Sequence, residues 1–236
     1  DGIISIFGTS NKGAKLRLYS PNKAKYLELF SSGNYTSSVS WNLSAGGESG
    51  NMFMGQGTGE SITNGTGNTG FGYIALNKLT SGGYNIAIGR YALEKNATGS
   101  NNVAIGAEAL NKSEGMSDNV AVGKFALRYA TGSEKSTAVG GGALSGTTTG
   151  DNNTAIGYDA GNIITTGRNN TFVGYNSDAG AVDLENATAL GTGASVTASN
   201  TIQLGNTSVS NVKTSGTVTA GALTYPNTDG SANQVL

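Results

Sequence analysis

The sequence predicts an all-β protein built as a parallel β-solenoid, or β-roll, of 17-residue coils. Three observations lead to this fold class: a glycine that returns every 17 residues, an alternation of small and β-branched residues before each glycine, and a composition poor in charged residues. The pattern predicts three parts in chain order: a small N-terminal β unit over residues 1–50, the solenoid over 51–205, and an extended neck or intertwined tail over 206–236.

The N-terminal part alternates polar and apolar residues in three short segments, as half-buried strands do. These segments cover residues 15–19, 26–30 and 39–43. Turn-forming residues separate them, namely Ser20-Pro21-Asn22 and the stretch from Ser31 to Asn34. We expect a three-stranded β unit here.

The repeat itself is visible as nine glycines on one period, which does not arise by chance. After the ninth, one step of 14 residues reaches Gly205. Typical units read NIAIGRYAL (85–93) and NVAIGAEAL (102–110). The nine glycines are Gly55, Gly72, Gly89, Gly106, Gly123, Gly140, Gly157, Gly174 and Gly191.

Four columns accompany the glycine. An apolar residue such as Ile88 precedes it directly, alanine usually stands two positions before it, and Ala-Leu pairs follow three and four positions after it. The column four positions before the glycine is asparagine in seven of the nine coils; Ser136 stands in one of the others and Ala187 in the last. We expect a structural ladder of these amides, formed by Asn51, Asn68, Asn85, Asn102, Asn119, Asn153 and Asn170.

The short alternating stretch has the period of a strand and not of a helix. Seventeen residues are too few for a strand, a crossover helix and a return strand. They suit one coil of two short strands and two turns, with glycine providing positive φ or close backbone approach. Stacked coils then repeat every ~4.8 Å, so that the asparagines form an amide ladder and the Ile/Val column forms an apolar stripe.

The small size of the coil predicts an oligomer. A 17-residue coil encloses little, and its alanine face leaves room for the backbone of another chain. We therefore expect partner chains to complete the core, most plausibly as a homotrimer. From Asn206 onward the chain is thin in apolar residues, and this tail again needs other chains to become ordered.

Composition excludes several functions. The chain has no cysteine and no histidine, which removes thiolate sites and the side chain best suited to proton transfer near neutral pH. The formal charge of −1 offers no overall electrostatic footprint for nucleic acid, and no apolar run is long enough to span a bilayer. We expect no cofactor, no metal site, no nucleic-acid partner and no membrane insertion.

The Asn-x-Ala-Ile-Gly units resemble the head repeats of YadA-like trimeric adhesins, which implies a left-handed parallel β-roll. The 14-residue step from Gly191 to Gly205 is similar to the period of that family, whereas the main array has three extra residues per coil. The flanks resemble phage tail fibres: residues 16–43 are similar to a small β unit of such fibres, and residues 200–230 to the stretch that often precedes an intramolecular trimerisation chaperone.

Two sets of residues are candidates for catalysis or for ligand binding. The acids Asp151, Asp159, Asp178, Asp183 and Glu185 lie in variable columns, where solvated side chains are expected, and they do not predict the facing carboxylate pair of a glycosidase. Aromatic and cationic residues just after the repeat glycines suit a glycan- or receptor-binding face, although for any one of them we favour coverage of neighbouring coils or contact between protomers. They are Tyr73, Arg90, Tyr91, Lys124, Phe125, Tyr158 and Tyr175.

These observations lead to one functional hypothesis and two alternatives. We expect a non-enzymatic, extracellular, structural and receptor-binding segment of a trimeric tail fibre, on a phage or a phage-tail-like particle, that attaches to a glycan or protein of the host cell surface. The first alternative is the head of a trimeric adhesin on a bacterial cell surface. The second is a glycan depolymerase of the tailspike type.

Overall fold

The computed structural model describes residues 15–19, 26–30, 50–213 and 215. Their regular structure is entirely β, as the sequence predicts, and the described residues contain no helix. The chain divides after Asn206 into two compact units.

In the N-terminal part, β1 (Lys15–Tyr19) pairs antiparallel with β2 (Tyr26–Phe30). Leu16 lies opposite Leu29, and Leu18 opposite Leu27. These are two of the three predicted strands. The third, predicted over 39–43, lies outside the described residues, as does most of the predicted tail.

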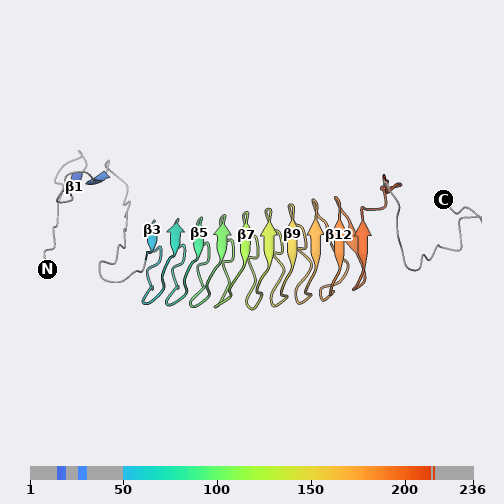
Figure 1. Ribbon diagram of the computed structural model, residues 1–236, viewed down its shortest axis with the longest axis horizontal. Helices are drawn as coiled ribbons and strands as arrows, with labels where there is room; N and C mark the ends of the chain where they lie inside the picture. The colour runs from blue at the N-terminus through green and yellow to red at the C-terminus, as the bar shows by residue number, and fades with distance from the viewer. Residues whose placement is uncertain (1–14, 20–25, 31–49, 214, 216–236) are drawn as a thin grey trace, which may run out of the picture. The chain divides into compact units, whose positions relative to one another are not determined.

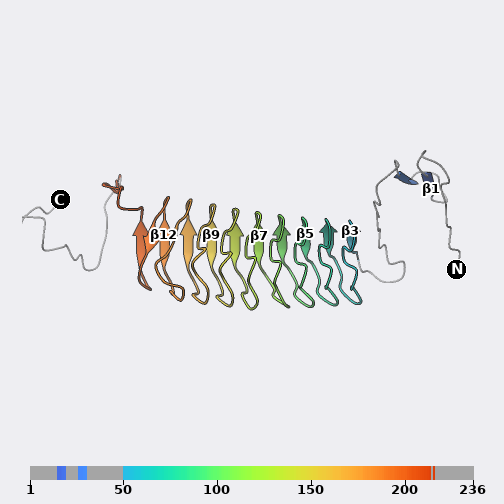
Figure 2. The same ribbon diagram turned by 180° about the vertical axis from the view of Figure 1, so that it is seen from behind.

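The solenoid is a single row of ten short parallel strands, side by side and pointing the same way (Figure 1, Figure 2). Neighbours in the sheet are neighbours in the chain, and like residues face each other: Ala87 pairs with Ala104, and Ala104 with Ala121. The strands are β3 (Met52–Met54), β4 (Thr69–Phe71), β5 (Ile86–Ile88), β6 (Val103–Ile105), β7 (Val120–Val122), β8 (Thr137–Val139), β9 (Thr154–Ile156), β10 (Thr171–Val173), β12 (Thr188–Leu190) and β14 (Ile202–Leu204).

The prediction of two strands in each coil is wrong for most of the solenoid. A second ladder exists only near the C-terminal end, where β11 (Asp178–Ala179) pairs with β13 (Ser195–Val196). Elsewhere the segment after the glycine alternates into the left-handed region, with φ of 59° at Tyr91 and 49° at Leu93. The amide of Tyr91 then donates to the coil before it and that of Leu93 to the coil after it, at 2.9 and 3.0 Å. Backbone polar groups are thereby satisfied without a regular strand.

The glycine column fixes the period because the backbones meet there. Gly89 has a φ of 135°, which L-residues rarely adopt. A Cβ on Gly89 would lie 2.5 Å from the carbonyl oxygen of Gly106, and the same clash recurs along the column. A side chain at this position would push neighbouring coils apart.

The interior of the coil is made by one chain. Alanines of the strand column and the Ala-Leu pairs, such as Ala87, Ala92 and Leu93, have no exposed surface. The expectation that a partner chain packs on the alanine face is therefore wrong: that face points inward, and leucines of the same chain close it. Each such leucine contributes about 1.5–3 kcal/mol of burial free energy.

Two coils depart from the alanine column with a buried phenylalanine, and glycine accommodates each ring. Phe172 stands where most other coils have alanine. Gly161 stands four positions after its repeat glycine, where the coil before it has Leu144. A Cβ on Gly161 would lie 2.6 Å from the Phe172 ring. Phe53 is matched in the same way by Gly59. Side-chain volume is exchanged between columns, so that the interior stays filled.

The last coil closes the interior with a polar side chain. Gln203 occupies the alanine column in β14, and its Nε2 donates to the carbonyl of Gly205 at 2.8 Å. Stacked repeats need such polar ends, because an open apolar end would face water. The shortened 14-residue step coincides with this cap.

The exchange between Phe172 and Gly161 gives a double-mutant test. Phe172→Ala removes a buried ring and Gly161→Leu clashes with it, so we expect each single change to destabilise the fold by roughly 3 kcal/mol. The double variant restores the alanine–leucine combination of other coils and should recover most of this loss. Chemical unfolding of the four proteins measures it, and losses that simply add would contradict the exchange.

Candidate functional site

The asparagine column is a continuous hydrogen-bonded ladder inside the solenoid. The Oδ1 of Asn85 accepts from both the backbone amide and the Nδ2 of Asn102, each at 3.0 Å. The Nδ2 of Asn102 also donates to the carbonyl of Met116 at 2.7 Å, which ties the strand to the next turn. Asn68, Asn85, Asn102, Asn119, Asn153 and Asn170 are buried, so this ladder faces no ligand.

The single gap in the ladder is filled by two serines. Where Ser136 replaces asparagine, its side chain is too short to reach the turn. Ser133, in a column where glycine is common, instead donates to the carbonyl of Gly150 at 2.6 Å and lies 3.2 Å from the Ser136 hydroxyl. The Oγ of Ser136 still accepts from the amide of Asn153 at 3.2 Å. The ladder therefore continues through the exception.

A second side-chain ladder was not predicted from the sequence. Side-chain oxygens six positions before the repeat glycine accept the backbone amide of the equivalent residue in the preceding coil. For example, the Oγ of Ser117 accepts from the backbone amide of Ser100 at 3.1 Å. The Oδ1 of Asp151 accepts from the backbone amide of Glu134 at 2.8 Å. Because serine and aspartate alternate with other residues in this column, no single residue type reveals it.

The aromatic row, defined as the seven candidate residues beside the glycines, divides into three groups along the axis. In the first, Tyr73 meets Tyr91 edge to face with ring centroids 5.5 Å apart, and the guanidinium of Arg90 lies 4.6 Å from the centre of the Tyr91 ring. Tyr73 is exposed, whereas one face of Tyr91 is covered by its neighbour in sequence.

In the second group, two cations share one ring. The Nζ of Lys124 and the guanidinium of Arg128 each lie 4.5 Å from the centre of Phe125. Arg128 also lies over Tyr129 at 5.0 Å and pairs with Glu108 at 2.6 Å. Arg128 and Tyr129 are not evident from the sequence pattern, because they follow the buried Ala-Leu pair rather than the glycine.

The third group is the pair Tyr158 and Tyr175, whose rings stack 5.9 Å apart at 15°. Both side chains are exposed. A Cβ on Gly141 would lie 3.3 Å from the Tyr158 ring. This ring therefore lies over the preceding coil at a position that has no side chain. Because the rings stack on each other, each has one face covered by the other ring.

The seven residues thus do not form one site. The described coils place them in groups two coils, or about 10 Å, apart. Much ring surface is already used by cations or by other rings. The left-handed conformation of Tyr91 and Phe125 is shared by Ile74 and Glu108 in the same column, so it belongs to the coil and does not mark a binding residue.

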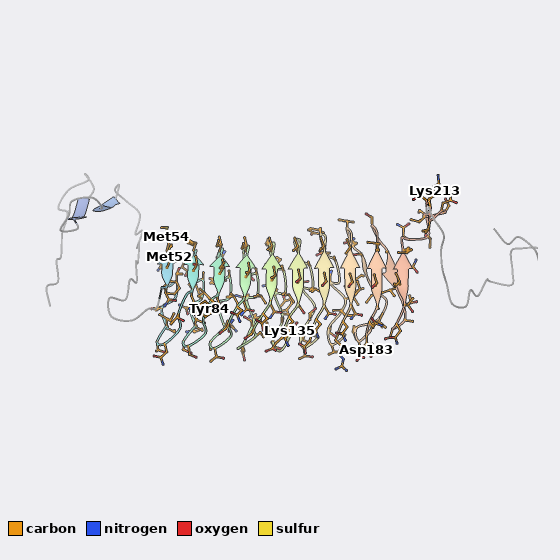
Figure 3. All side chains as sticks on the ribbon, viewed as in Figure 1. Met52, Met54, Tyr84, Lys135, Asp183 and Lys213 are labelled. Atoms are coloured by element: carbon orange, nitrogen blue, oxygen red, sulfur yellow. The ribbon has the colours of Figure 1, made fainter. Side chains whose placement is uncertain are left out.

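The outer face of the sheet carries a row of exposed apolar side chains. It consists of the side chains one and three positions before each repeat glycine, and we call it the outer stripe. Ile88, Ile105 and Ile156 are 40%, 37% and 46% exposed although they lie in the middle of a ten-stranded sheet. Figure 3 shows its first members, Met52 and Met54, on the strand side, with Lys135 and Asp183 on the loop side. Threonine enters the stripe at Thr69, Thr137, Thr154, Thr171 and Thr188.

Three of the five acids, namely Glu185, Asp151 and Asp178, have a local partner. Glu185 pairs with Arg168 at 2.7 Å, and Asp151 accepts a backbone amide. Asp178 accepts the amides of Ile163 and Ala179 at about 3 Å. Burial raises the pKa of Asp178, with a smaller contribution from Asp159, while the backbone donors act the other way. In the described coils, no three such side chains gather in a way that would hold a metal ion.

Comparison with known proteins gives no relative: no family model, no curated protein and no solved structure matches the chain. Within the described ranges no helix is long and apolar enough to cross a membrane. The fold itself defines the class of protein. The chain is a β-solenoid repeat protein with 17-residue coils and an interior made of alanine, leucine and asparagine.

The raised pKa of Asp178 predicts the pH dependence of stability. Because burial disfavours its ionised form, its contribution to stability is complete below its unfolded pKa of about 3.9 and is lost as the pH rises through its folded pKa. Asp178→Asn keeps an oxygen acceptor without the charge, so it should be more stable than the parent at pH 7 and similar at pH 3. Urea unfolding at both values tests this, with exposed Asp183→Asn as the control for loss of a charge. Equal gains in the two variants would contradict it.

Proposed function

We propose that this chain is a structural and receptor-binding segment of a homotrimeric tail fibre, on a phage or phage-tail-like particle, that attaches to a host cell surface. The observation that carries the proposal is the outer stripe. Parallel sheets occur almost only with both faces covered. Here the inner face is covered by the coil's own turns, and the outer face carries exposed isoleucine, valine and leucine.

Other copies of this chain are the cover that fits the stripe. Ten strands at a spacing of about 4.8 Å, each three residues wide, give a straight strip of roughly 430 Å². A stable pairwise interface needs about 800 Å² per partner, so two strips face to face fall short. Three chains with their stripes toward a common axis add contacts from the sides of the coils. A solenoid repeated at a constant rise keeps this match along its whole length.

An extended rod suits a spacer that presents its sides. The exposed Tyr73, Tyr158 and Tyr175 are suited to contact a receptor, since tyrosine combines an apolar ring with a hydroxyl. The local partners of Glu185, Asp151 and Asp178 favour the fibre over the glycan depolymerase. An adhesin head on a bacterial surface would use the same stripe and the same rings.

The trimer is tested by mass in solution. We expect three times the 23.7 kDa of one chain. Placing two carboxylates on the stripe with Ile105→Glu and Ile156→Glu should dissociate it into folded monomers, because buried unpaired charges are strongly unfavourable. Val182→Glu, which changes an exposed apolar residue of a turn, is the matched control and should stay trimeric. A folded monomer at micromolar concentration for the parent chain would sink the proposal of a trimer.

Attachment is tested by binding of the labelled trimer to host cells. We expect Tyr158→Ala combined with Tyr175→Ala to lower attachment roughly tenfold while leaving the mass unchanged. Tyr84→Ala, which removes an exposed tyrosine from a different column, should have little effect. Release of oligosaccharides from host polysaccharide would instead require catalysis and would overturn the non-enzymatic role.

A further inference from the structure

Three lysines form a column that the functions above do not use. Lys78, Lys95 and Lys112 stand six positions after successive repeat glycines. Hydrogen bonds between coils hold them in register: the amide of Lys78 donates to Glu94 and that of Lys112 to Arg128, at 3.0 and 3.1 Å. We call these three residues the lysine column. In the next coil the column continues with exposed Tyr129, over which Arg128 lies.

The lysine column makes no ion pair with the described residues around it. None of its three ammonium groups has an ion pair or a side-chain hydrogen bond within the described part of the chain. The adjacent carboxylates are held by other groups. The carboxylate of Glu94 accepts from the side-chain Nδ2 of Asn111 at 2.8 Å, and Glu108 pairs with Arg128. Like charges repeated at the coil spacing of about 4.8 Å therefore remain to attract an anion.

Charge is distributed unevenly along the axis, and the lysine column lies in the more basic part. Between residues 74 and 130 the cations are Lys78, Arg90, Lys95, Lys112, Lys124 and Arg128, against Glu94, Glu108, Glu114 and Asp118. Between residues 131 and 186 only Lys135 and Arg168 face six carboxylates, those of Glu134, Asp151, Asp159, Asp178, Asp183 and Glu185. The net charge of −1 conceals a basic stretch next to an acidic one.

We propose that the lysine column binds a linear acidic polysaccharide that runs along the solenoid axis. One cation per coil fits a chain with one carboxylate per sugar ring. Duplex nucleic acid carries a charge every ~1.7 Å of its axis, far denser than the column can match. The inference deepens the proposed attachment role, on which it rests, by naming the chemical class of the receptor.

The experiment is a titration of the full chain with polygalacturonate, which has one carboxylate per ring. The methyl-esterified polymer has the same backbone without the charge and serves as the ligand control. We expect binding to the acid form only, weakening roughly tenfold between 50 and 200 mM salt as counterions are displaced. Single-stranded oligothymidylate is the test for a nucleic acid.

The matched variants are a triple change, Lys78→Gln, Lys95→Gln and Lys112→Gln, and a control, Lys135→Gln, in another column. The triple variant should lose about tenfold in affinity for polygalacturonate, with an unchanged mass and unfolding midpoint, and the control should not. Equal binding of both polymers, full binding by the triple variant, or tighter binding of oligothymidylate overturns the inference.

Cell attachment, measured separately, distinguishes the two proposals. A chain that attaches to cells but does not bind polygalacturonate keeps the fibre role and overturns the lysine column as a polysaccharide site. A chain that binds polygalacturonate through the column but does not attach to cells keeps the column and overturns the fibre role.

Discussion

Each coil must lie directly on the coil before it, and this contact between backbones governs the rest of the molecule. At Gly89 the carbonyl of Gly106 occupies the space that a Cβ would need. Because this contact leaves no room for a side chain, glycine must recur at the same point of each coil, and every other residue then has a fixed place around the coil. Like side chains then meet like side chains, which lets asparagine form an internal ladder and excludes bulky residues from the alanine column unless glycine yields space, as at Phe172 and Gly161.

A complete interior shifts binding to the outside of the coil. The core is filled by one chain, so the outer stripe is not needed to finish it and remains open for other copies. The aromatic row and the lysine column lie in other columns of the same coil, one just after the glycine and one six positions later. A single repeat thus carries several independent surfaces, and each one extends along the axis by repetition.

The fold could be predicted from the sequence because its determinants are periodic. Nine glycines and seven asparagines identify the coil, and the two described N-terminal strands lie where alternation predicts them. The direction of the alanine face was mistaken, since alternation shows two faces without showing which is inside. The second strand was mistaken too, because left-handed residues such as Tyr91 and Leu93 satisfy the backbone in a way that no residue preference signals.

The candidate site was less predictable. The position of a ring beside the glycine is evident from the sequence, but the cation that covers it is not, as Arg128 over Phe125 shows. The serine pair that continues the ladder could be recognised only when Ser133 and Gly150 were placed together. Variable columns carry no periodic signal, and they hold the residues on which recognition depends.

The exchange between Phe172 and Gly161 also bears on how such a rod changes length over evolution. Loss of 17 residues from Gly157 onward removes both partners and leaves a uniform stack. Loss of 17 residues from Thr171 onward removes the ring alone and sets Ala189 above Gly161, with a void between them. A 17-residue deletion therefore leaves a filled interior only when it removes both members of this pair or neither. Among the uniform alanine–leucine coils between residues 74 and 144, any break is equivalent.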